Sequence, residues 1–184
     1  AGQIALDAVV NNIIAVRSGD TILATIRVAG ELYRLVPIEG GKHALVEVDQ
    51  SKFLVDEDES GYAEMLRNAV AVDPTEKASN GAKAISTIRI LVAFGRSATA
   101  AVGNEQQAMD LAFSESNTAL ATTNTEIRFQ QAGAIQFYTQ TESTTYSTML
   151  SRLTNGSDGF YDAIAGQRNT NTADMVAYIA PSNP

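Results

Sequence analysis

The side chains that most often carry catalysis are scarce in this sequence. Its 184 residues contain a single histidine, His43, and no cysteine. A catalytic zinc usually takes at least two histidine ligands, and a Ser-His-Asp triad would need His43 together with a G-x-S-x-G turn that the sequence lacks. Without cysteine, disulfides, thiolate metal sites and cysteine nucleophiles are excluded. His43 follows Gly40-Gly41-Lys42, so we expect an exposed histidine in a turn.

Oxygen ligands for a metal gather in two places. Residues 56–59 form the acidic run D-E-D-E, and residues 155–159 read N-G-S-D-G. Neither segment has the alternating D-x-D-x-D-G spacing of a calcium-binding loop. We therefore predict a solvated linker for the first segment and a turn that ends a helix for the second.

The composition limits the partners and the class of protein. Lys and Arg total 13 against 21 Asp and Glu, which gives a net charge of −8 and argues against nucleic acid as a partner. With 45% hydrophobic residues the chain can build a packed core. No apolar run is long enough to predict a membrane span.

The first 55 residues read as an antiparallel β domain. Apolar and polar residues alternate over 22–28, and two further strands are expected over 32–36, closed by Pro37, and over 44–48. Residues 4–16 are apolar enough for one or two more strands, ended by Ser18-Gly19-Asp20. Such a small sheet needs another element to cover one of its faces.

The remaining chain divides into a linker and an α/β part. Residues 56–84 begin with an acidic run and end with small, loop-like residues, with a short helix expected over 62–72, and form the best domain boundary. Beyond it, residues 85–184 alternate strand and helix in the order β-α-β-α-β, which favours a sheet with crossover helices. The strands are expected over 88–94, over 127–137 with a bend at Gly133, and over 174–179; the helices over 104–123, 146–153 and 159–167.

The order of five segments in this second part resembles a known family. They are residues 88–94, 115–120, 124–129, 137–142 and 161–179. In this order they resemble the first strand, the Asn-containing first helix, the lead into strand two, the Y-T-E that ends strand two, and the approach to strand three of bacterial reprolysin-like zinc metalloendopeptidases. These are metzincins, and the group includes the peptidyl-Asp metalloendopeptidases. Residues 31–37 and 43–49 similarly resemble strands of the family's β-rich propeptide.

This resemblance implies a secreted or periplasmic zymogen that hydrolyses peptide bonds with a zinc-activated water. The family binds its zinc through H-E-x-x-H-x-x-G-x-x-H, and this sequence contains no such motif. The chain is therefore expected to be a fragment: a propeptide domain over 1–55, a processing linker over 56–84, and over 85–184 the β-α-β-α-β front half of a metzincin-like domain. We assign no catalytic, cofactor or metal-binding residue within it, and we expect zinc only in the longer parent.

Zymogen latency and processing suggest further candidate residues. A prosegment side chain could reach the parent's zinc, and Asp49, Asp56, Asp58 or His43 could serve; steric blocking of the cleft by the β-rich segment is the favoured alternative. If the parent enzyme cuts before acidic residues, self-cleavage could fall in the linker. The aspartates there are Asp56, Asp58 and Asp73.

Two polar residues and four tyrosines are expected to act structurally. Asn117 would bond a neighbouring backbone group from within the first helix, and Arg168 would satisfy carbonyls near the start of the third strand. Half-buried positions at the rim of the core are expected for Tyr138, Tyr146, Tyr161 and Tyr178.

Two other interpretations stay open. The chain could be a non-catalytic binding or inhibitory module with half of a zincin-like fold, or a two-domain surface or adhesion protein. A sheet that lacks its last strand exposes an unpaired edge and an apolar face. We therefore expect self-association or a partner chain that covers this edge, and the parent's partners would be protein or peptide substrates.

Overall fold

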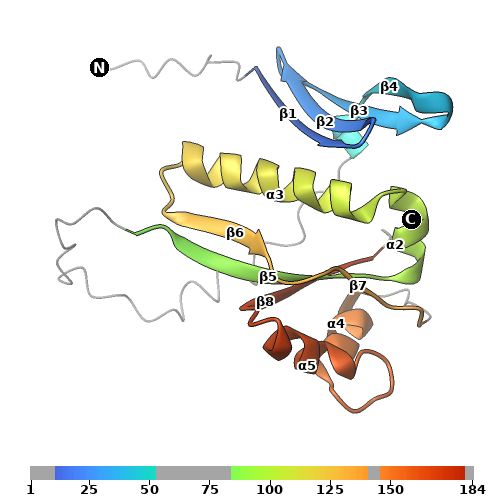
Figure 1. Ribbon diagram of the computed structural model, residues 1–184, viewed down its shortest axis with the longest axis vertical. Coiled ribbons are helices and arrows are strands. Elements are labelled where there is room, and N and C mark those ends of the chain that lie inside the picture. The colour runs from blue at the N-terminus through green and yellow to red at the C-terminus, as the bar shows by residue number, and fades with distance from the viewer. Residues whose placement is uncertain (1–10, 53–83, 141–145, 181–184) are drawn as a thin grey trace.

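The computed structural model describes residues 11–52, 84–140 and 146–180, and these form two separate β-sheets with helices between and below them (Figure 1). The first sheet contains four strands and the second contains parallel strands only. The predicted mixture of antiparallel sheet and helices is therefore confirmed. The expected helix over 62–72 lies outside the described residues.

The first sheet is an antiparallel meander in the order β1-β2-β3-β4. Its strands are β1 (Asn12–Ser18), β2 (Thr21–Val28), β3 (Glu31–Ile38) and β4 (Lys42–Glu47). Each hairpin turn contains a glycine with positive φ, for example Gly30 at 89°, as tight turns require. The short 3-10 turns η1 (Glu39–Gly41) and η2 (Gln50–Lys52) complete this region.

Strand β3 runs through Pro37, although the sequence predicts that Pro37 closes it. The pairing of β3 with β2 ends at Ala24 and Leu35, whereas the pairing of β3 with β4 continues to Pro37 and His43. Proline has no N–H to donate, and it is tolerated here because this end of β3 is no longer paired with β2.

The second sheet is built around β5 (Ser86–Phe94). One edge of β5 pairs with β6 (Ile127–Gln131) and then with β7 (Gln136–Phe137), and the other edge pairs with β8 (Met175–Ile179). All three pairings are parallel, as the β-α-β-α-β pattern predicts. The strand expected over 127–137 is interrupted at Gly133, whose φ is 71°. A Cβ atom there would lie 2.0 Å from Oδ1 of Asn171, so only glycine fits.

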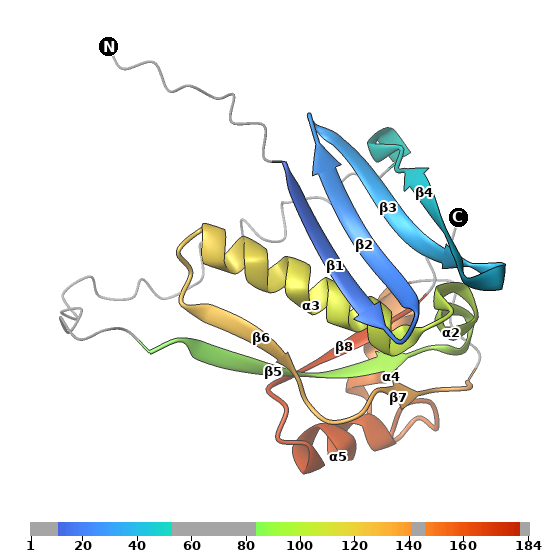
Figure 2. The same ribbon diagram turned by 45° about the horizontal axis from the view of Figure 1, so that its top comes forward.

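Helices cover both faces of the parallel sheet, as Figure 2 shows. On one side lie α2 (Arg96–Val102) and α3 (Glu105–Thr122), and on the other lie α4 (Tyr146–Thr154) and α5 (Ala163–Thr170). The Asn104 side chain accepts a hydrogen bond from the Gln107 N–H and caps α3, close to the predicted start. Helix α2 was not predicted, and α5 begins four residues later than expected.

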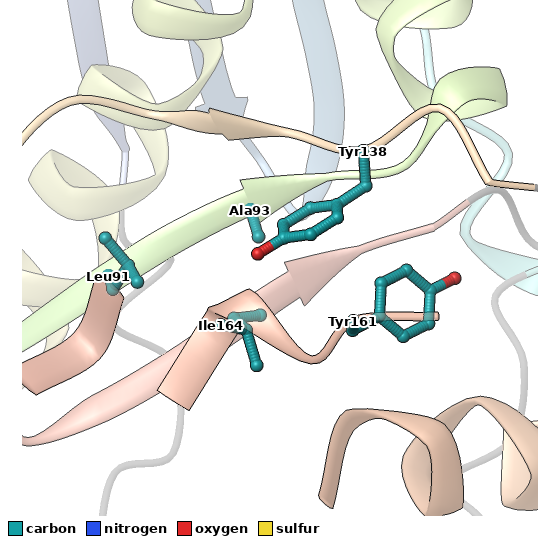
Figure 3. Close-up of a cluster of buried hydrophobic side chains, with 5 residues drawn as sticks. All are labelled: Leu91, Ala93, Tyr138, Tyr161 and Ile164. Atoms are coloured by element: carbon teal, nitrogen blue, oxygen red, sulfur yellow. The ribbon is translucent and has the colours of Figure 1, made fainter. Parts of the chain in front are cut away.

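The core lies on both sides of β5 because its side chains alternate. Leu91 and Ala93 pack with Tyr138, Tyr161 and Ile164 on the side of α4 and α5 (Figure 3). On the opposite side, a second cluster packs against α2 and α3. Its buried members are Val92, Phe94 and Ala98. The nearly continuous apolar run over 88–94 thus reflects a strand covered on both faces, as predicted.

The meander lies on the outer side of α3, so the layers follow one another as meander, α3, parallel sheet, and α4 with α5 (Figure 1). Strands β1 and β2 are the part of the meander that contacts α3. Helix α3 therefore covers one face of the meander as well as one face of the parallel sheet, and it meets the expectation that another element covers the small sheet.

Candidate functional site

The only histidine has a structural position in the meander. His43 lies in β4 and is half-buried, so the prediction of an exposed turn histidine is wrong. Its Nε2 accepts a hydrogen bond of 2.8 Å from the Ile22 N–H, where the pairing of β2 with β3 has already ended. A ring nitrogen that accepts this bond carries no proton and cannot bind a metal at the same time.

The described residues offer no other ligand set for a metal. Among residues 11–52, 84–140 and 146–180, no three His, Cys, Asp or Glu side chains lie close enough together to hold an ion. Oδ1 of Asp49 accepts hydrogen bonds from the N–H and the hydroxyl of Ser51, and its Oδ2 lies 3.7 Å from Nζ of Lys52. Asp56, Asp58 and Asp73 lie outside the residues that the structure describes.

The second oxygen-rich segment is a turn, as predicted. Oδ1 of Asp162 accepts hydrogen bonds from the N–H groups of Asp158 and Gly159, and Oδ1 of Asp158 accepts from the N–H of Phe160. Both carboxylates are thus engaged by the backbone that links α4 to α5. These bonds stabilise the turn and explain why α5 starts only at Ala163.

Asn117 joins α3 to the edge of the parallel sheet. Its Nδ2 donates to the carbonyl of Phe129 at 2.9 Å, and its Oδ1 accepts from the N–H of Phe129 at 2.8 Å. The side chain thereby pairs with β6 as a neighbouring strand would, and it satisfies two backbone groups on the edge that faces away from β5. The prediction that Asn117 bonds a backbone group is confirmed.

Arg168 does not have its predicted role. The side chain is exposed on the last turn of α5, and its guanidinium donates to Oδ1 of Asn169 rather than to backbone carbonyls. The start of β8 is held by Arg89 of β5 instead. Its Nη2 donates to the carbonyl of Asn171, and its backbone N–H donates to Oδ2 of Asp174.

Three tyrosines pack against one another beside the parallel sheet. The rings of Tyr138 and Tyr161 lie 5.3 Å apart, and those of Tyr161 and Tyr178 lie 5.0 Å apart. The Tyr138 hydroxyl donates to Oε1 of Gln167 at 2.6 Å, and the hydroxyls of Tyr161 and Tyr178 are 3.1 Å apart. Tyr161 is only 1% exposed, so it lies deeper than the predicted rim.

Burial raises the pKa of the Tyr138 phenol above its ordinary value of 10.0. The phenol therefore stays protonated at neutral pH and acts as a hydrogen-bond donor rather than a base. Together these tyrosines attach α5 and the segment that precedes it to the carboxyl ends of β7 and β8. The side chain of Tyr146 lies outside the described residues.

An apolar surface lies beside β8, at an edge of the parallel sheet. Among the strands that the structure describes, β8 pairs with β5 alone. Beside it, a shallow apolar pocket lies between α4, α5 and β8, where Leu150 and Met175 are about half exposed. This surface fits the predicted need for a covering element, and no described residue shows what that element is.

Nothing in the sequence pattern signals the burial of Gln107. Gln107, on the first turn of α3, is 2% exposed, and its side chain forms hydrogen bonds with β1 and β2 of the meander. A glutamine beside an apolar helical stripe is typical of a solvated position, and only the docking of β1 and β2 reveals its role.

No helix of the described segments is long and apolar enough to cross a membrane.

Comparison with known proteins finds relatives by sequence only. The chain is 40% identical over 169 residues to a peptidyl-Asp metalloendopeptidase of Stenotrophomonas maltophilia K279a and 39% identical to that of strain R551-3. It is 38% identical over 173 residues to the peptidyl-Asp metalloendopeptidase of Xanthomonas campestris pv. campestris. These alignments cover 90–92% of the chain, which spans about two fifths of the length of these relatives. No protein-family model and no solved structure matches the chain.

Proposed function

We propose that this chain forms the amino-terminal part of a secreted, zinc-dependent metalloendopeptidase precursor of the reprolysin-like metzincin group. The observation that carries the proposal is the similarity to three peptidyl-Asp metalloendopeptidases over nine tenths of the chain. The parallel β-α-β-α-β arrangement after residue 85 supports it, because the same order of segments carries the resemblance in the sequence.

The proposed division of the chain follows its two sheets. Residues 1–55, which include the meander, would be the propeptide; residues 56–84 would be the processing linker; and residues 85–184 would begin the catalytic domain. The meander and the parallel sheet share no strand, which supports a boundary between them. Cleavage before Asp56, Asp58 or Asp73 would then cut the covalent link between the propeptide and the catalytic part.

Zinc does not fit the described residues, which contain no group of three suitable ligands. In the proposed enzyme a zinc ion would activate the attacking water, and its ligands would come from elsewhere in the longer protein. The described residues would provide support instead. Asn117 fixes α3 to β6, and the tyrosines hold α5 against the sheet, so the parallel sheet forms a rigid base for the metal-binding part.

The structure bears on how the precursor would be kept silent. The Nε2 of His43 accepts a hydrogen bond from Ile22, and the carboxylate of Asp49 accepts hydrogen bonds from Ser51. Each side chain would lose these bonds if it moved to a metal. Steric blocking of the cleft by the β-rich segment requires no such loss within the meander. We therefore favour it over His43 and Asp49.

Expression of the natural reading frame that contains these 184 residues tests the proposed function. We expect an H-E-x-x-H motif downstream, and a purified product that hydrolyses Asp-containing peptides and loses this activity when a chelator removes the metal. Amino-terminal sequencing of the mature form should place its first residue within the linker. A reading frame that stops without the motif, or a folded product that hydrolyses no peptide, would favour a non-catalytic binding module.

A further inference from the structure

The side chain of Gln107 fastens the meander to α3. Its Nε2 donates to the carbonyl oxygens of Val16 at 3.0 Å and of Thr21 at 3.2 Å. Its Oε1 accepts a hydrogen bond of 3.2 Å from the Thr21 hydroxyl. Val16 belongs to β1 and Thr21 to β2, so one amide bridges both strands of the hairpin. Because two of the three partners are main-chain carbonyls, the contact recognises the backbone of a hairpin more than its side chains.

The rest of this interface is less well satisfied. Strand residues alternate in direction, so Thr25 lies on the same face of β2 as Thr21, toward α3. Helix residues four apart share a face, so Leu111 and Glu115 follow Gln107 along α3. Leu111 and Thr25 are 5% and 4% exposed. The buried oxygens Oγ1 of Thr25 and Oε1 of Glu115, however, have no hydrogen-bond partner among the described residues.

An interface of this composition differs from the centre of a single domain. A buried polar atom without a partner has lost its hydrogen bonds to water, and it regains them when the surfaces separate. The amide of Gln107 opposes separation, because it and its two carbonyl partners would have to exchange good hydrogen bonds for bonds to water. Mixed polar and apolar contacts of this kind are typical of surfaces that can associate and dissociate.

We propose that the meander is a separable partner of α3, held through the buried amide of Gln107, and that the two parts remain a non-covalent complex after the chain between residues 53 and 83 is cut. The occupant of this face of α3 is the β1–β2 hairpin of the same chain, recognised by its carbonyls. The docking requires no peptidase activity, so it can hold or fail independently of the proposed function.

The direct test uses the full chain with a recognition sequence for a site-specific protease inserted between residues 53 and 83. After complete cutting, confirmed on a denaturing gel, size-exclusion chromatography with light scattering measures the mass of the native particles. We expect both pieces in one peak with the mass of the uncut chain. Elution of the two pieces as separate, folded species at micromolar concentration would overturn the proposal.

A matched pair of variants tests the role of Gln107. Gln107→Ala leaves the carbonyls of Val16 and Thr21 without their donor, and we expect the cut complex to dissociate at least about tenfold more readily, equivalent to about 1.4 kcal/mol. Gln106→Ala is the control, because the exposed Gln106 bonds only to Asp110 and Gln131 and should leave the complex unchanged. Equal dissociation of the two variants would contradict the proposal.

Hydrogen exchange on the uncut chain keeps the test decisive if a cut variant aggregates. In Gln107→Ala the amides of β1 and β2 should lose protection, whereas those of β5 should keep theirs. Unchanged protection of β1 and β2, or equal loss in β5, would show that Gln107 does not hold a separable unit.

Discussion

The meander and the parallel sheet bury their side chains to very different extents. In β5 the four residues from Leu91 to Phe94 are at most 1% exposed. In the meander Ile13 and Leu45 are 67% and 60% exposed, and only Ala24, Thr25 and Leu32 are buried. Apolar burial is the main favourable term in folding. The parallel sheet therefore has a core of its own, whereas the meander depends on α3.

The difference has a simple origin in the two sequences. Strand β5 is apolar without interruption from Ile90 to Phe94 and has helices on both faces. The meander strands alternate, and α3 covers only one of their faces, mainly at β1 and β2. One helix thus serves two layers: it completes the core of the parallel sheet through Met109 and Phe113, and it docks the meander through Gln107.

The largest expected effect comes from breaking the core of the parallel sheet. Phe94→Ala removes a side chain that is 1% exposed, and we expect the free energy of unfolding to fall by about 3–5 kcal/mol. The matched control is Phe137→Ala, whose ring lies 6.4 Å from that of Phe94 but is 56% exposed, so its cost should be about 1 kcal/mol. Urea unfolding followed by circular dichroism measures both. Equal losses would contradict the assignment of the core to β5.

The second effect concerns the edge of the parallel sheet. Asn117→Ala leaves the N–H and the carbonyl of Phe129 without partners, and should cost about 1–3 kcal/mol. Asn117→Asp keeps the acceptor but loses the donor, so we expect an intermediate loss. Thr118→Ala, on the exposed side of the same turn, should change stability by no more than about 0.5 kcal/mol. If Asn117→Ala leaves the free energy of unfolding unchanged, the edge of β6 at Phe129 needs no side-chain partner.

The third effect is a dependence on alkaline pH. Burial raises the pKa of Tyr138 in the folded state, so the unfolded chain releases this proton first as the pH rises. Stability is fully present below the ordinary pKa of 10.0 and is lost as the pH rises from there through the higher folded pKa. Tyr138→Phe should cost about 1 kcal/mol at neutral pH, through the lost bond to Gln167, and should reduce the alkaline loss. An unchanged alkaline slope in unfolding experiments would contradict this assignment.

The smallest effect is expected in the meander. Leu45→Thr replaces a side chain that is 60% exposed by one that also favours strands, so stability should change by no more than about 0.5 kcal/mol. Thermal unfolding compared with Phe94→Ala measures the contrast between the two sheets. A loss above about 2 kcal/mol would show that something in the protein covers this face of the meander.

Local patterns predicted most of the elements. Alternation gave the strands of the meander, Asn104 marked the start of α3, and the continuous apolar run marked β5. Helix α2 was missed because Arg96–Val102 is short and small, with no apolar stripe. The start of α5 was misplaced because the backbone before it bonds to the carboxylate of Asp162, a local competition that helical periodicity does not show.

Long-range contacts could not be predicted. Asn117 was expected to bond backbone, since asparagine on a buried helix face needs partners, but nothing local names Phe129. His43 and Arg168 were misjudged for the same reason. His43 accepts a hydrogen bond from the Ile22 N–H, which is available because the β2–β3 pairing has ended. Near the start of β8, where Arg168 was expected to bond carbonyls, it is Arg89 of another strand that donates to a carbonyl.

The most direct test of the proposed function is a chimera. In it, this chain replaces the matching two fifths of the Stenotrophomonas maltophilia K279a relative. We predict a folded protein that hydrolyses an Asp-containing peptide, loses this activity on metal chelation and regains it when zinc is added, with the unaltered relative assayed beside it. A chimera that is folded by circular dichroism but hydrolyses no peptide at any zinc concentration would contradict the proposal that this chain forms the front of a metalloendopeptidase.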